Sequence, residues 1–183
     1  MLTSSLRPQG ASSSITLAAA TMKSLSFLHL CVWAAWFGSL FYTTFIAGIV
    51  MFKQLPRQTF RDVQEVLFPA YFRLSLLCIS LLAILAPLAF ATVSPLQWRL
   101  LYSSLGATLL NLLWLEPATT AVMKERALLE KTSPSVAAGA YPEGKEAKLK
   151  SLGKDFGKFH GLSSLFNLSA IITCIGYGFE LIL

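Results

Sequence analysis

The sequence has few charged residues for its length. Only 13% of its 183 residues are Asp, Glu, Lys or Arg, whereas 55% are hydrophobic, and the mean hydropathy is +0.62. Soluble domains carry about 25% charged residues, because charged side chains keep a globular surface solvated. The shortage of charge therefore disfavours a soluble enzyme, and the high hydrophobic content disfavours a disordered chain. We expect a membrane protein with a single domain.

Cysteine and histidine are also scarce. Cys31, Cys78 and Cys174 each lie within an apolar stretch, where they form neither a disulfide framework nor a metal-ligand pattern. His29 and His160 lie at opposite ends of such stretches, so we do not expect them to share a metal ion. The sequence has no glycine-rich phosphate loop, no His-Glu-x-x-His motif and no nucleophile elbow. We therefore expect no catalytic residue, no metal site and no cofactor.

What the sequence does contain is long apolar stretches. About 20 mostly apolar residues are needed for a helix to cross the hydrocarbon layer of a membrane. Four stretches are long enough: 25–52, 70–93, 96–115 and 161–183. Their only Asp, Glu, Lys or Arg residues are Arg73, Arg99 and Glu180. Because backbone groups in lipid must be hydrogen-bonded internally, the sequence predicts an all-α integral membrane protein with four transmembrane helices within residues 25–183.

The residues before the first span permit several interpretations. Residues 1–24 are expected to form a disordered leader. Residues 1–22 contain Arg7, no acidic residue and many Ser, Thr and Ala, a composition that superficially resembles an organelle presequence. Translation from Met22 is a further alternative. We expect a location in the endomembrane system or plasma membrane, with an organelle membrane as the alternative.

Lys and Arg are distributed unevenly between the two predicted sides of the membrane. One side has three: Arg7, Lys23 and Arg99. The other side has twelve: Lys53, Arg57, Arg61, Arg73, Lys124, Arg126, Lys131, Lys145, Lys148, Lys150, Lys154 and Lys158. Cytoplasmic loops carry the excess of Lys and Arg. The first and third loops, including residues 116–160, are therefore predicted to be cytoplasmic.

Short amphipathic interfacial helices are predicted in both cytoplasmic loops. The first covers residues 59–67, between Pro56 and Pro69. The second covers residues 149–159, where the apolar residues share one face and three lysines share another: Lys150, Lys154 and Lys158. We expect these lysines to attract anionic lipid headgroups. Nucleic acid is not expected as a partner, because the basic face lacks an exposed aromatic platform.

Titratable side chains are predicted to gather at the cytoplasmic ends of the spans. They are Arg57, Arg73, Glu116 and His160. One interpretation is structural: ion pairs and snorkelling side chains hold the helix ends at the membrane surface. The other is functional: Glu116 and His160 form a proton or cation site, because a carboxylate beside an imidazole can hold or pass a proton near neutral pH.

Two amides are predicted to lie deeper in the bundle. Asn111 is five residues inside Glu116, and Asn167 is seven residues inside His160, on antiparallel spans. At 1.5 Å per residue, both reach about 8–10 Å below the titratable groups. We expect them either to hydrogen-bond to each other or to continue a polar path from Glu116 and His160.

Linked motifs along the chain resemble the pattern of a known family. They are His29, Gly38, Thr44, Phe45 and Gly48; Leu55-Pro56-Arg57 with Thr59-Phe60; Val63-Gln64, Leu67-Phe68-Pro69 and Tyr71-Phe72; Trp114-Leu115-Glu116-Pro117 with Thr119-Thr120 and Met123; and His160-Gly161-Leu162-Ser163-Ser164-Leu165 with Asn167-Leu168. From His29 to about Leu168, the sequence is similar to the transmembrane protein 205-like family. The resemblance implies a four-span domain without a defined biochemical activity.

These observations predict a non-enzymatic membrane protein that acts in membrane organisation or as a subunit of a membrane assembly. The alternative is a small transporter or proton-coupled permease that uses Glu116 and His160. Four close-packed helices fill their own interior with side chains, so a conduction path would require a homo- or hetero-oligomer.

Overall fold

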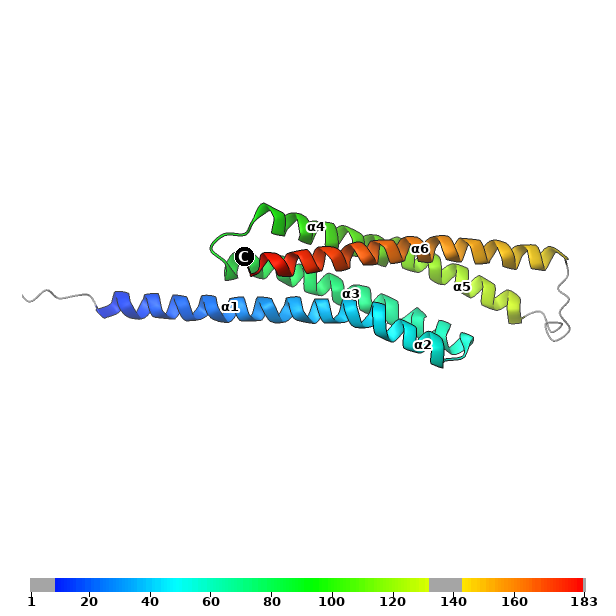
Figure 1. Cartoon of the computed structure of the whole chain (residues 1–183), viewed down its shortest axis with the longest axis horizontal. Coiled ribbons are helices and arrows are strands. Elements are labelled where there is room, and N and C mark those ends of the chain that lie inside the picture. The colour runs from blue at the N-terminus through cyan, green and yellow to red at the C-terminus, as the bar shows by residue number, and fades with distance from the viewer. Residues whose placement is uncertain (1–8, 132–142, 183) are drawn as a thin grey trace, which may run out of the picture.

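Helices form all the regular structure in the part of the chain described by the computed structural model, residues 9–131 and 143–182. The elements are α1 (Gln9–Phe41), the π-helix η1 (Tyr42–Ala47), α2 (Gly48–Gln54), α3 (Arg57–Ala89), α4 (Pro95–Leu110), the π-helix η2 (Asn111–Leu115), α5 (Glu116–Lys131) and α6 (Glu143–Glu180). Each π-helix continues directly into its neighbours, so the elements form four long rods (Figure 1). The prediction of an all-α fold is confirmed.

The rods pack around one apolar core. α1 packs against α3, α4 packs against both α3 and α6, and α5 packs against α6. Large side chains from all four rods are buried in the core, among them Trp36, Leu40, Ile79, Leu82, Leu101 and Tyr177. Small residues let α4 approach α6 closely, and the hydroxyl groups of Ser104 and Thr173 share a hydrogen bond across this contact.

Three helices of the described chain are long and apolar enough to cross a membrane: Thr16–Gln54, Arg57–Ala89 and Gly144–Glu180. Many of their outward side chains are large and apolar, including Phe27, Leu77, Ile84, Leu165 and Ile172. A surface of this kind is typical of a protein surrounded by lipid. The rod that contains α4 is less apolar, because Arg99 and Asn111 interrupt its apolar stretch.

The prediction of separate, short interfacial helices is wrong. Residues 59–67 belong to α3, which continues through Pro69, and residues 149–159 belong to α6. Extending an existing helix costs much less than nucleating a new one, so a single internal proline does not end α3. The amphipathic pattern itself is present, because Leu152 is buried and Lys154 is exposed. This half of α6 packs against α5.

The start of α1 also differs from the prediction. Helix begins at Gln9, inside the stretch of residues 1–24 for which a disordered leader is predicted. Alanine is the strongest helix former, and the run Ala18–Ala20 leads into the apolar part of α1 without a helix-breaking residue, so the helix extends backwards from the span. Residues 1–8 and 132–142 lie outside the described chain.

A capping box begins α4 at the end of the bundle that also contains the end of α6. The Ser94 hydroxyl accepts a hydrogen bond from the backbone N–H of Gln97, and the Gln97 side chain accepts one from the backbone N–H of Ser94. The Ser94 hydroxyl also donates to Glu180 Oε2 at 2.9 Å. The turn between α3 and α4 is therefore bound directly to the last turn of α6.

Candidate functional site

A cavity of about 480 Å³ lies beside the π-helices, in the half of the bundle that contains α2 and α5. It is bordered by η1 and α2 on one side, α5 and α6 on another, and α3. Its lining residues are Thr43, Thr44, Gly48, Ile49, Phe52, Phe60, Gln64, Phe68, Tyr71, Phe72, Glu116, Thr119, Thr120, Met123, Phe156, His160, Ser163, Ser164 and Asn167. All four rods therefore contribute to one site.

One π-helix, η1, lines this cavity, and the other, η2, ends directly before the lining residue Glu116. The backbone N–H of Gly48 bonds to the carbonyl of Thr43, and that of Glu116 bonds to the carbonyl of Asn111, each five residues back. A π-turn accommodates one extra residue and so changes which side chains face a neighbouring helix. Thr43 and Thr44 line the cavity from η1, and Glu116 follows η2 directly. Such turns occur frequently at functional sites.

A chain of hydrogen bonds connects three rods across the cavity. The Tyr71 hydroxyl donates to Asn167 Oδ1 at 2.6 Å, and Asn167 Nδ2 donates to Thr44 Oγ1 at 2.9 Å. Tyr71 is only 5% exposed. The amide of Asn167 thus holds α3 and η1 against α6, because each of its two polar atoms has a partner on a different rod.

Glu116 and His160 provide the titratable groups of the cavity. The Thr120 hydroxyl donates to Glu116 Oε1 at 2.8 Å. None of the salt bridges in the described residues involves Glu116. The ring of His160 stacks on Phe156, with centroids 5.4 Å apart. Within residues 9–131 and 143–182, no lysine or arginine lines the cavity, and no cluster of three metal-binding side chains exists.

Three of the six polar residues proposed from the sequence meet in this cavity: Glu116, His160 and Asn167. Arg57 and Arg73 are exposed and do not line it. Asn111 is buried, and its Oδ1 has no hydrogen-bond partner in the described chain. The predicted hydrogen bond between Asn111 and Asn167 is therefore wrong. Equal depth along two helices does not determine which faces meet, and Asn167 faces α3 and η1.

Several cavity residues were not selected from the sequence as site residues. Thr44 and Tyr71 hold Asn167, and Thr120 holds Glu116. Their signal was present in the motifs that carry the family resemblance, which include all three residues. Isolated threonines and tyrosines in apolar helices are too common for composition or periodicity to single them out.

A second cavity, of about 600 Å³, lies near the opposite end of the bundle and has mostly apolar walls. His29 lines it, and its Nε2 lies 2.9 Å from the Tyr177 hydroxyl. His29 Nδ1 is buried without a hydrogen-bond partner among the described residues. No acidic or basic side chain other than His29 lines this cavity in the described chain, so it offers less chemistry than the cavity at Glu116.

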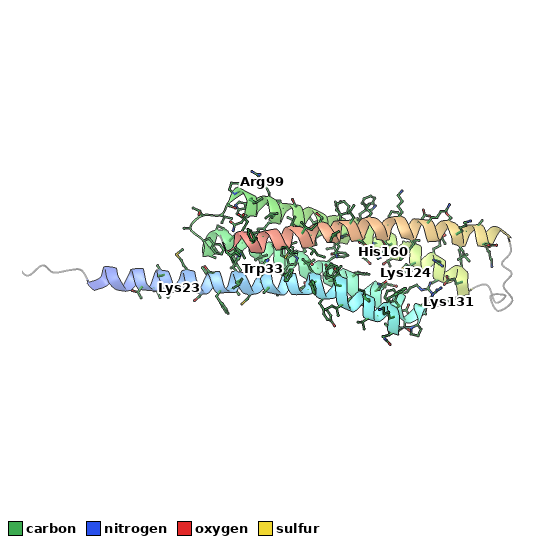
Figure 2. The ribbon with its side chains drawn as sticks, viewed as in Figure 1. Lys23, Trp33, Arg99, Lys124, Lys131 and His160 are labelled. Atoms are coloured by element: carbon green, nitrogen blue, oxygen red, sulfur yellow. The ribbon has the colours of Figure 1, made fainter. Side chains whose placement is uncertain are left out.

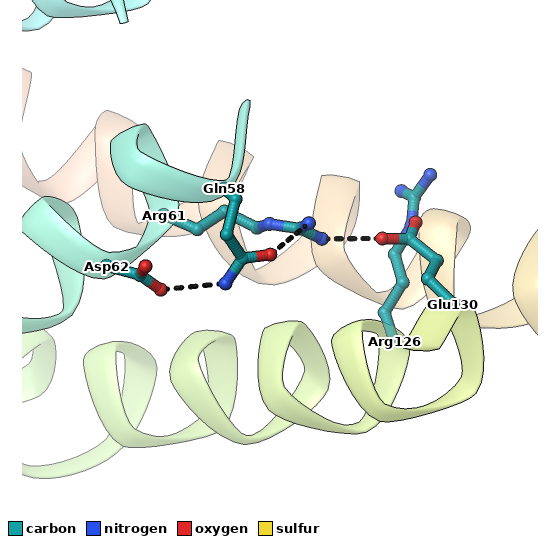
Figure 3. A network of polar contacts seen from close by, with 5 residues as sticks. All are labelled: Gln58, Arg61, Asp62, Arg126 and Glu130. Carbon is teal, nitrogen blue, oxygen red and sulfur yellow. Dashed lines mark hydrogen bonds and ion pairs between the residues drawn. The ribbon is translucent and has the colours of Figure 1, made fainter. Parts of the chain in front are cut away.

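Ion pairs connect the polar ends of α3, α5 and α6. Arg61 Nη1 lies 2.9 Å from Glu130 Oε2, and Arg126 Nε lies 3.0 Å from Glu130 Oε1 (Figure 3). Two further pairs join the same helices, Lys124 with Glu65 and Lys148 with Glu125. Burial raises the pKa of Glu130, but the hydrogen bonds and charges of Arg61 and Arg126 outweigh it, so the net pKa is lowered below the ordinary value of 4.5.

Replacing Glu130 with Gln is expected to lower the stability of the purified protein by up to about 1 kcal/mol at pH 7. Because the folded pKa is lowered, the stabilisation is present above about pH 4.5 and is lost as the pH falls through the folded value. Thermal unfolding of wild type and variant should therefore differ at pH 7, and the difference should become smaller at an acidic pH well below 4.5. An equal difference at both pH values would contradict the ion-pair explanation.

Three exposed lysines on α6 are proposed to contact lipid headgroups: Lys150, Lys154 and Lys158. More generally, Lys124 and Lys131 lie toward one end of the bundle, whereas Lys23 and Arg99 lie toward the other (Figure 2). His160 lies on the side of Lys124. The cavity at Glu116 is therefore in the half of the molecule that carries the excess of basic residues.

Comparison with known proteins identifies the family. A family described as a domain of unknown function, DUF4149, matches residues 31–128, which include both π-helices and Glu116. Transmembrane protein 205 of Danio rerio is 30% identical over 155 residues, which cover 77% of this chain and 82% of the relative. No solved structure matches the chain. The chain therefore belongs to the transmembrane protein 205-like family and carries its DUF4149 domain.

Proposed function

We propose that this protein is a non-enzymatic, four-span membrane protein that binds a small ligand in the cavity at Glu116. The observation that carries the proposal is the convergence of Glu116 from α5 with His160 and Asn167 from α6 on one cavity of about 480 Å³. Ligand pockets typically enclose about 300–1,000 Å³ and combine apolar walls with a few polar groups. The cavity at Glu116 has both properties.

The rod formed by α4 and η2 is proposed as the fourth span. It packs against α3 and α6, which are both apolar enough to cross a membrane. α4 has 16 residues and η2 has 5, which together give a length of about 31 Å. This length suits the hydrocarbon layer of about 30 Å. By contrast, α6 has 38 residues and a length of about 57 Å, so it must extend beyond the membrane.

The excess of basic residues favours a cytoplasmic position for the end of the bundle that carries Lys53 and Lys154. Single cysteines placed at Lys53, Lys154 or Lys23 in a background without native cysteines test this orientation. A membrane-impermeant maleimide is expected to label the first two from the same side, and Lys23→Cys from the other. Labelling of Lys53→Cys and Lys154→Cys from opposite sides would contradict the four-span arrangement.

Binding without conduction is favoured by the packing beyond the cavity. The core toward the opposite end is closed by Trp36, Leu40, Ile79 and Leu82, each at most 1% exposed. A solute that crossed a single bundle would have to displace these side chains. Ligand binding from one side requires no such movement.

A cavity-filling substitution tests the proposal. Ser163 lines the cavity, whereas Ser169 lies on the same helix, is exposed and does not line it. Ser163→Trp is expected to abolish retention of a small molecule by protein purified from its native membrane, and Ser169→Trp is expected to preserve it. Native mass spectrometry measures the bound mass. A bound mass that persists in Ser163→Trp would show that the cavity is not the binding site.

Proton-coupled transport is a second candidate, because both titratable groups, Glu116 and His160, line one cavity. In reconstituted vesicles it predicts a pH-dependent flux that Glu116→Gln removes. Flux equal to that of empty vesicles would count against it.

Membrane organisation or a role as an assembly subunit would instead be supported by a stoichiometric protein that co-purifies after gentle extraction. We also propose that anionic headgroups bind at Lys150, Lys154 and Lys158.

A further inference from the structure

Given the proposed binding function, we propose that the ligand at Glu116 is an organic monocation, in which an ammonium-type group is joined to an apolar body. Two independent features carry this assignment. One is the charge of the cavity, and the other is the aromatic character of its walls.

The charge of the cavity comes from Glu116. It is the only Asp, Glu, Lys or Arg that lines the cavity in the described chain, and it forms no salt bridge with any described residue. Its Oε1 accepts from Thr120, which orients the carboxylate but does not neutralise it. A partly buried carboxylate near lipid is costly unless a cation compensates it. A bound cation would supply the missing partner.

The walls of the cavity are rich in aromatic rings. Six line it: Phe52, Phe60, Phe68, Tyr71, Phe72 and Phe156. Phe52 and Phe60 meet edge to face with centroids 5.7 Å apart, and Tyr71 and Phe72 lie 5.0 Å apart. Aromatic faces attract cations through the negative charge density of the ring, and their area also accommodates an apolar body. Ammonium compounds with apolar substituents satisfy both properties.

Other ligand classes fit this cavity poorly. An anion would approach Glu116 without any lysine or arginine in the wall to stabilise it. A metal ion would find only Glu116 and His160 as strong ligands, and no cluster of three metal-binding side chains exists in the described ranges. Metal ions require more donors than these two side chains supply.

The helices around the cavity pack in two pairs. α2 packs against α3, and α5 packs against α6. All four of these helices line the cavity. A lipid with a cationic headgroup and a soluble hydrophobic amine share the chemistry that this lining requires, so the test has to distinguish the two sources.

Equilibrium dialysis of the full chain in zwitterionic lipid nanodiscs tests the assignment. The probes are radiolabelled benzyltrimethylammonium, benzyl alcohol and benzenesulfonate, with empty nanodiscs as the background. We expect the cation to bind tightest, and Glu116→Gln to weaken its binding about tenfold while leaving benzyl alcohol unchanged. Glu146→Gln is the matched control, because Glu146 is exposed on α6 and does not line the cavity.

A second variant keeps the test valid if Glu116→Gln folds poorly. Phe156→Leu keeps an apolar side chain but removes a ring, so it is expected to weaken binding of the cation more than that of benzyl alcohol. Equal binding of cation and alcohol, unaffected by either variant, would overturn the cationic assignment. Ser163→Trp still distinguishes the two proposals: if it abolishes the alcohol binding, the ligand site at the cavity stands.

Competition with sphingosine distinguishes the two sources. Displacement of labelled benzyltrimethylammonium by a low mole fraction of sphingosine in the nanodisc supports a lipid amine. Resistance to sphingosine, together with displacement by unlabelled benzyltrimethylammonium, supports a soluble amine. If no probe binds above empty nanodiscs and Ser163→Trp changes no co-purifying mass, the binding function fails together with the assignment.

Discussion

Replacing Gly178 with alanine is expected to destabilise the bundle by about 2 kcal/mol or more. A Cβ atom at this position would overlap Cζ2 of Trp33 and lie 2.6 Å from its Cε2. The indole is held in place by its Nε1, which donates to the backbone carbonyl of Cys174 at 3.0 Å, and by stacking on Phe37. Relief of this overlap requires either that the indole gives up this hydrogen bond and moves into the cavity of about 600 Å³ that it lines, or that α1 and α6 separate.

Gly176→Ala is the matched control on the same helix. Its Cβ would meet Leu100 Cδ2 at 3.5 Å, an ordinary contact. Both substitutions gain a similar helix propensity, so their difference isolates the clash with Trp33. Thermal unfolding in detergent should show a large loss for Gly178→Ala and little change for Gly176→Ala. Combining Gly178→Ala with Trp33→Phe should restore part of the stability, and equal melting temperatures for the two single variants would contradict this explanation.

Replacing Asn167 with leucine is expected to cost about 1–2 kcal/mol of stability. The substitution keeps the side-chain size but removes the acceptor of the Tyr71 hydroxyl and the donor to Thr44. Tyr71 is buried, so its hydroxyl would lose a partner that water cannot easily replace. The same change should also distort the wall of the cavity.

A double-mutant cycle with Tyr71→Phe measures this interaction. The two substitutions should couple by about 0.6–1.7 kcal/mol, the range for hydrogen bonds between membrane helices. Asn111→Leu provides the comparison, because Asn111 Oδ1 has no partner in the described chain. It is expected to be additive with Asn167→Leu. Additive behaviour of Tyr71→Phe and Asn167→Leu would show that their hydrogen bond contributes little to stability.

The helical architecture could be predicted from particular stretches of sequence. The predicted span at 25–52 lies within the rod from α1 to α2, and most of the predicted span at 70–93 lies within α3, because a long apolar run has few other stable forms in a membrane. The ends of the helices could not be predicted. Pro69 and the lysine-rich start of α6 both resemble boundaries, yet helix continues through both. Propagating a helix costs less than nucleating a new one, and tertiary packing offsets the penalty of about 3 kcal/mol for an internal proline.

The candidate site was partly predictable for the same reason. Counting residues from the ends of apolar stretches places Glu116 and His160 at one depth and Asn167 about 10 Å deeper, and the three share one cavity. Arg57 and Arg73 have comparable depth but are exposed. Depth is a property of position along one helix, whereas membership of a cavity depends on the rotation of each helix about its axis.

By itself, the sequence determined that this chain forms apolar helices long enough to cross a membrane, and that basic residues concentrate toward one end. Hydrophobicity and helix rise determine both, because they act within each segment. Only the tertiary structure decided that Asn167 forms hydrogen bonds with Tyr71 and Thr44, and that Asn111 forms neither of these bonds. The two π-turns change which side chains face the neighbouring helices in the two rods that contain them. The rotation of each helix about its axis depends on contacts between segments far apart in the sequence, which no single segment specifies.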